Sequence, residues 1–267
     1  MESQFGLPGL FALSFMVIFL LVVGRYFLIA GIFHLYFHVW KREAWRNRNI
    51  HAQKEYAQGQ FRREMRWSMM TAVIFSLAGS AMVVLWMKGH TKVYIDDSYP
   101  FWWSLLSLPV FFFLHETYYY WIHRLMHQPK VFKLVHRVHH ESHIPSPWTA
   151  FSFHPLEGVL QAIIIPAIIM FIPIHLYGLI FLFTCMTISS VINHLGIEVY
   201  PGWFAKYSLG RLLIGATHHS LHHKQYKYNF GLYFTFWDKW VGTESPFYQP
   251  RFHALTQKKT QHQNDAE

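Results

Sequence analysis

The sequence predicts an all-α integral membrane protein with about four transmembrane helices in two hairpins and a histidine-rich helical cap on the cytoplasmic side. Three observations support this fold class. Of the 267 residues, 52% are apolar and 14% are charged, and the apolar residues form runs of the length, about 20 residues, that a bilayer-crossing helix needs. The basic residues are concentrated in one loop, and the histidines are grouped at helical spacing.

The first two predicted spans lie near the N-terminus. Residues 10–33 form an apolar run that only Arg25 interrupts, and residues 69–87 form a second run. The first run has no basic segment before it and is longer than the apolar part of a signal peptide. We therefore expect it to be a transmembrane helix rather than a cleaved leader.

The remaining apolar sequence predicts the second hairpin. A third span opens with residues 101–114 and continues through aromatic residues to Trp121. Residues 160–192 are too many for one crossing, and Pro173 falls within this run. Because proline interrupts a helix, we expect a helical hairpin or two packed half-spans here.

The distribution of the net charge of +9 predicts the orientation in the membrane. Eight basic residues lie in segment 41–66, whereas loop 88–100 has two lysines and two aspartates. Basic loops favour the cytoplasmic side, so segment 41–66 is predicted inside and the N-terminus outside. The third span then brings the chain back to the cytoplasm near His123, and the histidine-rich segments after it are predicted to be cytoplasmic. A basic surface beside membrane spans indicates contact with anionic lipid, and no nucleic-acid-binding motif accompanies it.

The histidines form three groups with helical spacing. Thirteen of the 20 histidines lie between His123 and His223. The groups are His123 with His127; His136 with His139 and His140; and His219 with His222 and His223. Residues three or four apart share one face of a helix, so each group can direct two or three imidazoles to one point. Imidazole is a common ligand of iron, zinc, copper and nickel, and a metal centre is therefore predicted.

The number of histidines predicts two metal ions. The three groups supply eight imidazoles, and His154 and His194 are further candidates. About ten imidazoles exceed the four to six positions of a single ion. Cys185 is the one cysteine, which argues against a structural zinc site built on thiolates. An all-nitrogen site in a membrane favours non-haem iron used for oxygen chemistry.

The histidine strings also resemble those of a known superfamily. His123-Arg-Leu-Met-His127, His136-Arg-Val-His-His140 and His219-Ser-Leu-His-His223 resemble the three histidine boxes of the fatty acid hydroxylase/sterol desaturase superfamily. Phe153-His-Pro-Leu-Glu-Gly158, after the second box, is similar as well. The resemblance covers roughly residues 61–243, and within the superfamily the chain looks most like the sterol Δ5-desaturases (lathosterol oxidases).

This resemblance implies a set of metal ligands. They are His123, His127, His136, His139, His140, His154, His194, His219, His222 and His223. Metal-bound imidazoles are usually oriented by neighbouring carboxylates or other polar groups. The candidates for that role are Glu116, Glu141, Glu157, His218 and Asp238. No catalytic residue beyond the metal centre and no cofactor-binding motif is expected.

The resemblance also implies an activity. Members of the superfamily use two iron ions and O2 to desaturate or hydroxylate an unactivated C–H bond of a lipid, and the sterol desaturases imply Δ5-desaturation of a sterol in lipid biosynthesis. The chain has no nucleotide-binding fingerprint, no haem-attachment motif and too few cysteines for an iron–sulfur cluster. We therefore expect electrons from NAD(P)H through a reductase and a separate b-type cytochrome or ferredoxin, which the basic surface would dock.

Three regions follow from these predictions. Residues 1–100 are expected to form an N-terminal transmembrane hairpin with a basic cytoplasmic loop, residues 101–250 the fatty acid hydroxylase/sterol desaturase catalytic domain, and residues 251–267 a polar tail. The multi-pass protein is expected in the cytoplasmic membrane of a bacterium or the endoplasmic reticulum of a eukaryote, with its site on the cytoplasmic side.

Two other functions are compatible with the same histidines. A hydroxylase of fatty acyl chains or sphingolipids would use the same ligands, and its products would distinguish it from a sterol desaturase. A non-enzymatic metal-storage or metal-transport protein would also bind metal. Transport requires polar or ionisable residues inside the spans, and the apolar runs contain few of them apart from Arg25.

Overall fold

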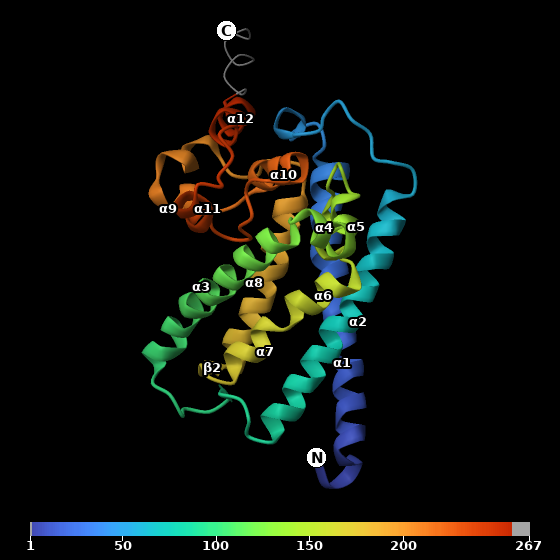
Figure 1. Cartoon of the computed structure of the whole chain (residues 1–267), viewed down its shortest axis with the longest axis vertical. Helices are drawn as coiled ribbons and strands as arrows, with labels where there is room; N and C mark the ends of the chain where they lie inside the picture. The colour runs from blue at the N-terminus through green and yellow to red at the C-terminus, as the bar shows by residue number, and fades with distance from the viewer. Residues whose placement is uncertain (1, 258–267) are drawn as a thin grey trace.

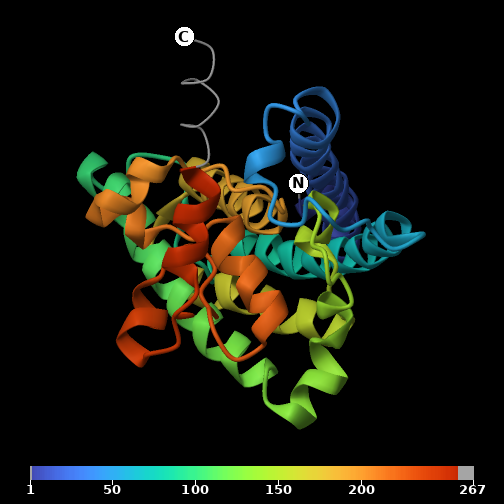
Figure 2. The same cartoon turned by 90° about the horizontal axis from the view of Figure 1, so that it is seen from above.

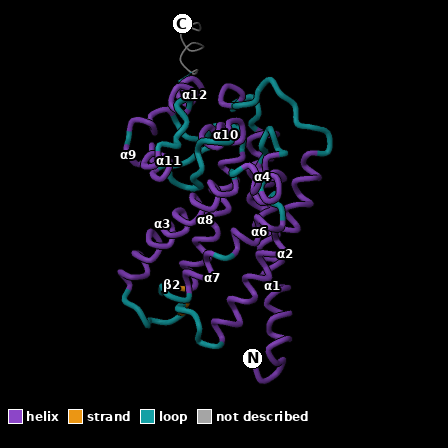
Figure 3. Tube along the Cα trace, viewed as in Figure 1, coloured by secondary structure: helices purple, strands orange, loops and turns teal. Residues whose placement is uncertain are grey.

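The structure, a computed structural model, describes residues 2–257, with side chains from Gly6 onward. Its regular secondary structure is almost entirely helical, and loops connect the helices (Figure 3). Four helices are long: α1 (Glu2–Phe33), α2 (Gln60–Met87), α3 (Phe101–Met126) and α8 (Leu176–His194). The shorter α-helices are α4 (Pro129–Val135), α5 (Arg137–His140), α6 (Pro155–Ala162), α7 (Ile164–Ile169), α9 (Ser208–Leu212), α10 (Ala216–Gln225), α11 (Phe236–Val241) and α12 (Tyr248–Thr256).

Short irregular elements connect these helices. The π-helix η1 (His34–Trp40) continues α1, and the 3-10 turns are η2 (Arg46–Arg48), η3 (Pro147–Phe151) and η4 (Gly202–Lys206). Two strands of two residues each, β1 (Val93–Tyr94) and β2 (Ile174–His175), pair in parallel. This pair ties the loop after α2 to the turn before α8.

Three helical segments are long and apolar enough to cross a membrane among the residues described. They are Gly6–Trp40, Gln60–Met87 and Leu176–His194, with mean hydropathies of 2.5, 2.0 and 1.7. Helix α3 has 26 residues but is not one of the three, so the expected total of about four spans stays a prediction. The expectation of a largely helical protein with long apolar helices is confirmed.

The long helices form the body of the molecule, most of the short helices lie toward one end of them, and α6 and α7 lie along their length (Figure 1). Helices α9 to α12 lie at the upper end of this view, and β2 lies near the lower end. From above, α1 in blue and the C-terminal helices in orange and red lie on opposite sides of the molecule (Figure 2). We call the end that carries α9 to α12 the cap.

The predicted apolar run 160–192 is not one continuous helix. Helices α6 and α7 lead away from the cap, the chain reverses at Pro173, and α8 returns to the cap and ends at His194 (Figure 1). Proline explains the reversal because its ring prevents the preceding helix from continuing. The return of α8 is what brings His194 to the histidine-rich end.

Aromatic packing fixes α1 against the segment that precedes α6. The Tyr26 hydroxyl donates a 2.8 Å hydrogen bond to the Trp148 carbonyl, and the Tyr26 ring stacks on Phe151 at a centroid distance of 5.3 Å. All three side chains are buried in one apolar cluster. Such a pairing of burial and hydrogen bonding favours a single arrangement of α1.

The polar tail expected at 251–267 starts inside a helix. Helix α12 extends through Thr256, and its Phe252 is buried against Leu221 and Tyr248. Residues 258–267 of the expected tail lie outside the described part of the chain.

Candidate metal centre

Two compact groups of histidines lie at the cap. In each group, one nitrogen from every imidazole lies within 4.8 Å of one nitrogen from every other imidazole. The five-histidine group consists of His123, His127, His136, His140 and His222. The four-histidine group consists of His139, His194, His219 and His223.

The helical spacing of each box divides its histidines between the two groups. His136 and His140, four residues apart, belong to the five-histidine group, whereas His139 belongs to the other. On α10, His219 and His223 are also four apart and share the four-histidine group, whereas His222 joins the five-histidine group. On a helix, residues i and i+4 point in nearly the same direction, and residue i+3 points to the side of them. Helices α5 and α10 therefore each supply histidines to both groups.

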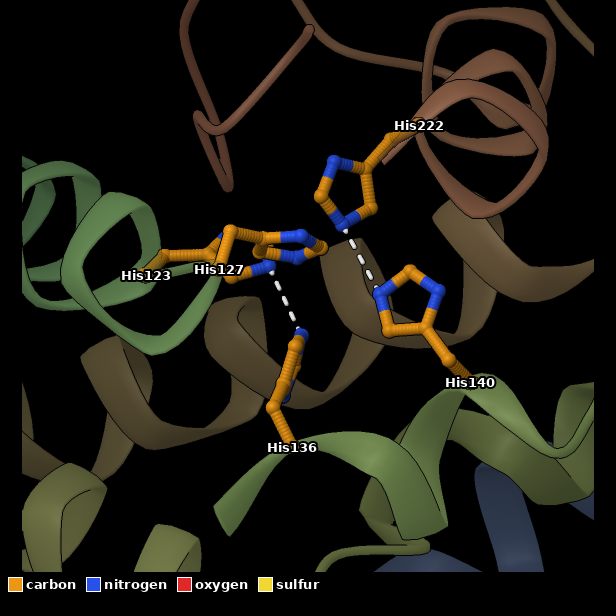
Figure 4. A group of neighbouring side chains, drawn as sticks. All are labelled: His123, His127, His136, His140 and His222. Carbon is orange, nitrogen blue, oxygen red and sulfur yellow. Dashed lines mark hydrogen bonds between the residues drawn. The ribbon is translucent and has the colours of Figure 1, made fainter. Parts of the chain in front are cut away.

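The imidazoles of the five-histidine group converge on a common point (Figure 4). His123 and His127 project from α3, and His222 projects from α10 on another side (Figure 4). The Nε2 atoms of His123 and His136 are 3.1 Å apart, as are those of His140 and His222. In the four-histidine group, the Nε2 atom of His194 lies 3.1 Å from that of His139 and 2.9 Å from that of His219.

Four of the Nδ1 atoms are hydrogen-bonded to a backbone carbonyl on the opposite side of the ring, and a fifth, that of His136, lies close to a carboxylate oxygen. The contacts are His123 with the Phe230 carbonyl at 2.8 Å, His139 with the Ser152 carbonyl at 3.3 Å, His194 with the Ser190 carbonyl at 2.7 Å, His222 with the Tyr228 carbonyl at 2.8 Å and His136 with Glu157 Oε1 at 2.9 Å. An acceptor at Nδ1 keeps the proton there and leaves the lone pair on Nε2. These rings are therefore in the tautomer that binds a metal through Nε2.

Two of the close pairs consist of rings that both have this tautomer. They are His123 with His136 and His139 with His194, and in both pairs the Nε2 atoms are 3.1 Å apart. Two lone pairs at this distance repel each other unless a cation lies between or beside them. One cation in each group removes the repulsion, so the donor set fits two metal ions.

Burial keeps the imidazoles in the neutral form. Burial and the neighbouring imidazoles lower the pKa values of six histidines of the cap well below their usual range: His136, His139, His140, His219, His222 and His223. A metal binds the deprotonated ring. The apolar surroundings thus prepare the ligands for a metal at neutral pH.

Among the predicted orienting residues, Glu157 contacts a clustered imidazole directly. Its Oε1 lies 2.9 Å from His136 Nδ1, and both side chains are fully buried. Gln161 donates a 3.1 Å hydrogen bond to the same oxygen. This is the carboxylate–histidine arrangement that orients metal ligands in other proteins.

Asp238 acts on the site through the backbone. Its carboxylate accepts hydrogen bonds from the Phe230 and Gly231 amides at 2.9 and 3.0 Å and from the Thr243 hydroxyl at 2.8 Å. These bonds hold the turn whose Phe230 carbonyl accepts from His123. His218 Nε2 lies 3.9 Å from Asp238 Oδ2, outside both histidine groups.

The other two predicted carboxylates have different contacts. Glu116 is buried on α3 and accepts 2.9 Å hydrogen bonds from the Leu232 and Tyr233 amides. Glu141 is partly exposed and lies 3.7 Å from Arg137. Glu116 therefore fixes the loop before α11, and Glu141 lies at the surface of α5.

His154 is the one predicted ligand that the structure does not bring to either group. It precedes Pro155, and its Nδ1 accepts a 3.3 Å hydrogen bond from the Leu156 amide at the start of α6. A residue before proline is held in an extended conformation, and here φ is −64° and ψ is 146°. This backbone directs the ring to cap its own helix, where it packs near Trp67.

Two buried carboxylates near the site were missed in the sequence. Glu64 on α2 accepts hydrogen bonds from the side chains of Gln60, Ser142, Ser146 and Thr149, at 2.6 to 2.9 Å. This carboxylate thus anchors the loop that follows the second histidine box. Its sequence signal is weak because it lies in a segment dominated by basic residues.

Glu198 is the second of these carboxylates. It accepts a 3.0 Å hydrogen bond from the Thr217 amide, in the first turn of α10, and another from the Tyr200 amide. An acceptor at this helix terminus satisfies a free amide and favours the helix dipole. Glu198 therefore fixes the start of the helix that carries the third histidine box.

An apolar cavity of about 560 Å³ leads to the four-histidine group. His194 is among the lining residues, as are Tyr119, Phe151, Phe153 and Leu232. The walls continue along α1, α2, α3, α7 and α8 toward Val93 and Leu176 at the other end of the bundle. Tyr119, from the aromatic run on α3, lines this cavity, whereas the run 111–113 is not part of its lining.

Comparison with known proteins identifies the family. Residues 108–243, which are 136 of the 267 residues, match the family described as fatty acid hydroxylase. The chain belongs to the fatty acid hydroxylase family. This result confirms the resemblance inferred from the histidine boxes.

Several relatives carry sterol desaturase names. The chain is 31% identical over 197 residues to human lathosterol oxidase, covering 71% of this chain and 62% of that protein. It is 29% identical over 198 residues to a Delta(7)-sterol 5(6)-desaturase of Gibberella zeae, covering 74% of this chain and 60% of that protein. It therefore spans about 60% of the length of these two relatives. A Delta(7)-sterol 5(6)-desaturase of Aspergillus fumigatus is 27% identical over 235 residues, with 78% and 71% covered. No solved structure matches the chain significantly.

Proposed function

We propose that this protein is a membrane-bound non-haem di-iron oxidoreductase that desaturates or hydroxylates an unactivated C–H bond of a lipid, using O2 and external electrons. The observation that carries the proposal is the position of His194. This residue belongs to the four-histidine group and also lines the apolar cavity. A lipid in the cavity would therefore have C–H bonds next to the metal-binding nitrogens.

Iron is the cofactor that this donor set favours. The five-histidine group would hold one ion and the four-histidine group the other, and neither group contains a thiolate. When bound, the iron pair supplies the reductive activation of O2 that breaks a strong C–H bond. Four imidazoles leave positions open on an ion that accepts up to six ligands, and the four-histidine group is the one that reaches the cavity.

The protein's own residues hold the ligands, exclude water and place the lipid. Glu157 and the carbonyls of Phe230 and Ser152 fix three imidazoles through their Nδ1 atoms. Phe151 and Phe153, both buried, form part of the cavity wall, and the centroid of the Phe153 ring lies 5.2 Å from that of His139 in the four-histidine group. A dry, rigid site of this kind confines the reaction to the C–H bond that is held nearest to the metal.

A sterol is the substrate class that the relatives favour. Lathosterol oxidase and the Delta(7)-sterol 5(6)-desaturases are named for reactions on sterols, and Δ5-desaturation in sterol biosynthesis is the corresponding proposal for this chain. The cavity volume of about 560 Å³ falls in the range of about 300–1,000 Å³ common for small-molecule sites. Hydroxylation of a fatty acyl chain or sphingolipid remains the alternative.

The proposed orientation places the cap in the cytoplasm, with α3 as a fourth span. The basic segment 41–66 supports this orientation because it contacts the residues that follow His194. The Ile50 amide donates a 2.9 Å hydrogen bond to the Gly196 carbonyl, and the Glu198 amide donates a 3.0 Å bond to the Arg48 carbonyl. The basic loop and the histidine groups therefore share one side, which the positive-inside rule assigns to the cytoplasm.

The same basic loop supports an electron-transfer partner. Its exposed side chains include Arg42 and Arg46, which would attract an acidic b-type cytochrome or ferredoxin. A reductase using NAD(P)H would supply that carrier.

Product analysis tests the proposed function. Iron-loaded protein would be combined with NADPH, a ferredoxin and its reductase, and then supplied with lathosterol or a stearoyl lipid. O2-dependent loss of two hydrogens, or gain of one oxygen, in mass spectrometry supports the proposal, provided that a His219→Ala/His223→Ala control gives no product. Fully loaded protein that oxidises neither lipid class would contradict it.

A further inference from the structure

Helix α1 carries one arginine in the middle of its apolar length. Arg25 lies about four residues, or roughly 6 Å at 1.5 Å per residue, from the centre of the run 10–33. A bilayer core extends about 15 Å on each side of its centre. A guanidinium at this depth has lost most of its hydration and requires a compensating partner.

Among residues 6–257, no carboxylate forms an ion pair or hydrogen bond with Arg25. Its Nε is buried and has no hydrogen-bond partner among residues 6–257, and its guanidinium lies against the ring of Phe183, whose centroid is 5.7 Å from Cζ. An aromatic face stabilises a guanidinium by cation–π attraction but leaves its N–H donors unsatisfied. The donors of Arg25 are therefore available to a ligand.

Arg25 lines the same cavity as His194. Phe183, which supports the guanidinium, precedes His194 by 11 residues on α8, which corresponds to about 16 Å along the helix. Cavity-lining Leu21 and Ile180 are 65% and 52% exposed, so the cavity meets the lipid-facing surface between α1 and α8. A lipid can therefore enter sideways and pass Arg25 before it reaches the histidines.

We propose that Arg25 binds the carboxylate of an acidic lipid whose chain extends through the cavity toward His194. Arginine presents several donors in a plane that matches a carboxylate, and the apolar walls match an acyl chain. A phospholipid phosphate stays near the membrane surface, about 15 Å from the centre, whereas a free acid can enter in its protonated form and ionise beside the guanidinium. The carboxylate is thus the anion that reaches this depth.

This inference rests on the proposed lipid oxidation and narrows its substrate. With the polar end at Arg25, the oxidised carbon lies about 16 Å from the carboxylate. A sterol held by its ring hydroxyl at Arg25 would present its side chain, rather than its ring system, to His194. The relatives favour a sterol, whereas the position of Arg25 favours the acyl alternative, and the product assay with both lipid classes decides between them.

Binding to metal-free protein tests the inference independently of catalysis. Native mass spectrometry in a non-ionic detergent at pH 8 would compare oleate with methyl oleate on wild type, Arg25→Met, Arg25→Lys and Lys88→Met. Lys88 is an exposed cation beyond the cavity and serves as the matched control. We expect wild type and Lys88→Met to prefer oleate by about 10- to 100-fold, the effect of a charge-assisted hydrogen bond.

The variants decide between the outcomes. Arg25→Met should bind both probes equally, and Arg25→Lys should keep part of the preference because it keeps the charge. Equal binding of the two probes by wild type, or a preference that survives in Arg25→Met, would overturn the proposal. Thermal unfolding of each variant confirms that it is folded. Failure of the lipid-oxidation assay would leave these binding ratios unchanged, so the two proposals can fail separately.

Discussion

Replacement of Glu157 should weaken one metal site and spare the other. Glu157 Oε1 lies 2.9 Å from His136 Nδ1, and neither side chain is exposed. Glu157→Leu removes the carboxylate that lies beside the buried His136 Nδ1 and leaves an apolar side chain in its place. Loss of such an orienting partner reduces metal affinity by about 10- to 100-fold in other proteins. We expect a loss of this size in the five-histidine group, which contains His136.

Glu157→Gln should have a smaller effect. The amide keeps a polar oxygen beside His136 Nδ1, but it lacks the negative charge that makes a metal-bound imidazole a stronger ligand. Glu141→Gln is the matched control because Glu141 is partly exposed and contacts Arg137 rather than an imidazole. The expected order of iron affinity is wild type equal to Glu141→Gln, then Glu157→Gln, then Glu157→Leu.

The assay is anaerobic titration of metal-free protein with ferrous iron, with bound iron measured after gel filtration. In Glu157→Leu one iron per chain should bind as in wild type and the second should require about 10- to 100-fold more free iron. Wild-type titration curves for both Glu157 variants would refute the role assigned to this contact. Equal weakening of both sites would show that Glu157 acts on the fold rather than on His136.

Four further outcomes are expected. His154→Ala should retain both irons in metal analysis, because the ring caps α6 instead of joining a group. Gly231→Ala should lower the free energy of unfolding by about 1–3 kcal/mol, and with it the melting temperature, because a Cβ there would lie 2.6 Å from the Phe234 carbonyl oxygen. An unchanged melting temperature would contradict the tight packing. Glu64→Ala should cost about 2–4 kcal/mol in chemical denaturation because four buried side-chain donors lose their acceptor, and Glu64→Gln should cost less. Burial lowers the pKa of His218 to about 3, so below about pH 6.5 the unfolded chain binds a proton that the folded chain does not. Metal-free protein should therefore lose stability between pH 7 and 5 in thermal scans. Constant stability over this range would contradict a buried neutral ring.

The sequence was most informative about the histidine boxes. Spacings of three and four residues on a helix indicated that neighbouring imidazoles share a face, and nine of the ten predicted ligands lie in the two groups. The way each box is shared between the groups could not be predicted, because it depends on how α5 and α10 face each other. Whether the nine histidines bind iron stays a prediction.

Contacts between distant segments account for the rest of the site. Glu157 and His136 are 21 residues apart, and no local pattern indicated that they would meet. Glu64 and Glu198 were missed for the same reason, since their partners come from other parts of the chain. His154 differs, because a local signal was present: the proline after it restricts its backbone and favours a helix cap over a ligand.

The long apolar runs predicted that helices form there but did not predict where each helix begins. Runs at the N-terminus and at 69–87 correspond to long helices, but Gln60–Met87 begins nine residues earlier than its apolar run. Polar residues in the first turns of α2, including Gln60 and Glu64, are buried against the loop that follows the second histidine box. Hydrogen bonds to the rest of the protein therefore extend α2 toward its N-terminus, beyond the point where hydropathy alone predicts that it begins.

Iron stoichiometry in a pair of double variants tests the central claim of two separate metal sites most directly. His123→Ala/His127→Ala removes two ligands from the five-histidine group, and His219→Ala/His223→Ala removes two from the four-histidine group. After anaerobic loading, we expect two iron ions per chain in wild type and one in each double variant. One iron or none in loaded wild type, or two irons in either double variant, would contradict the account.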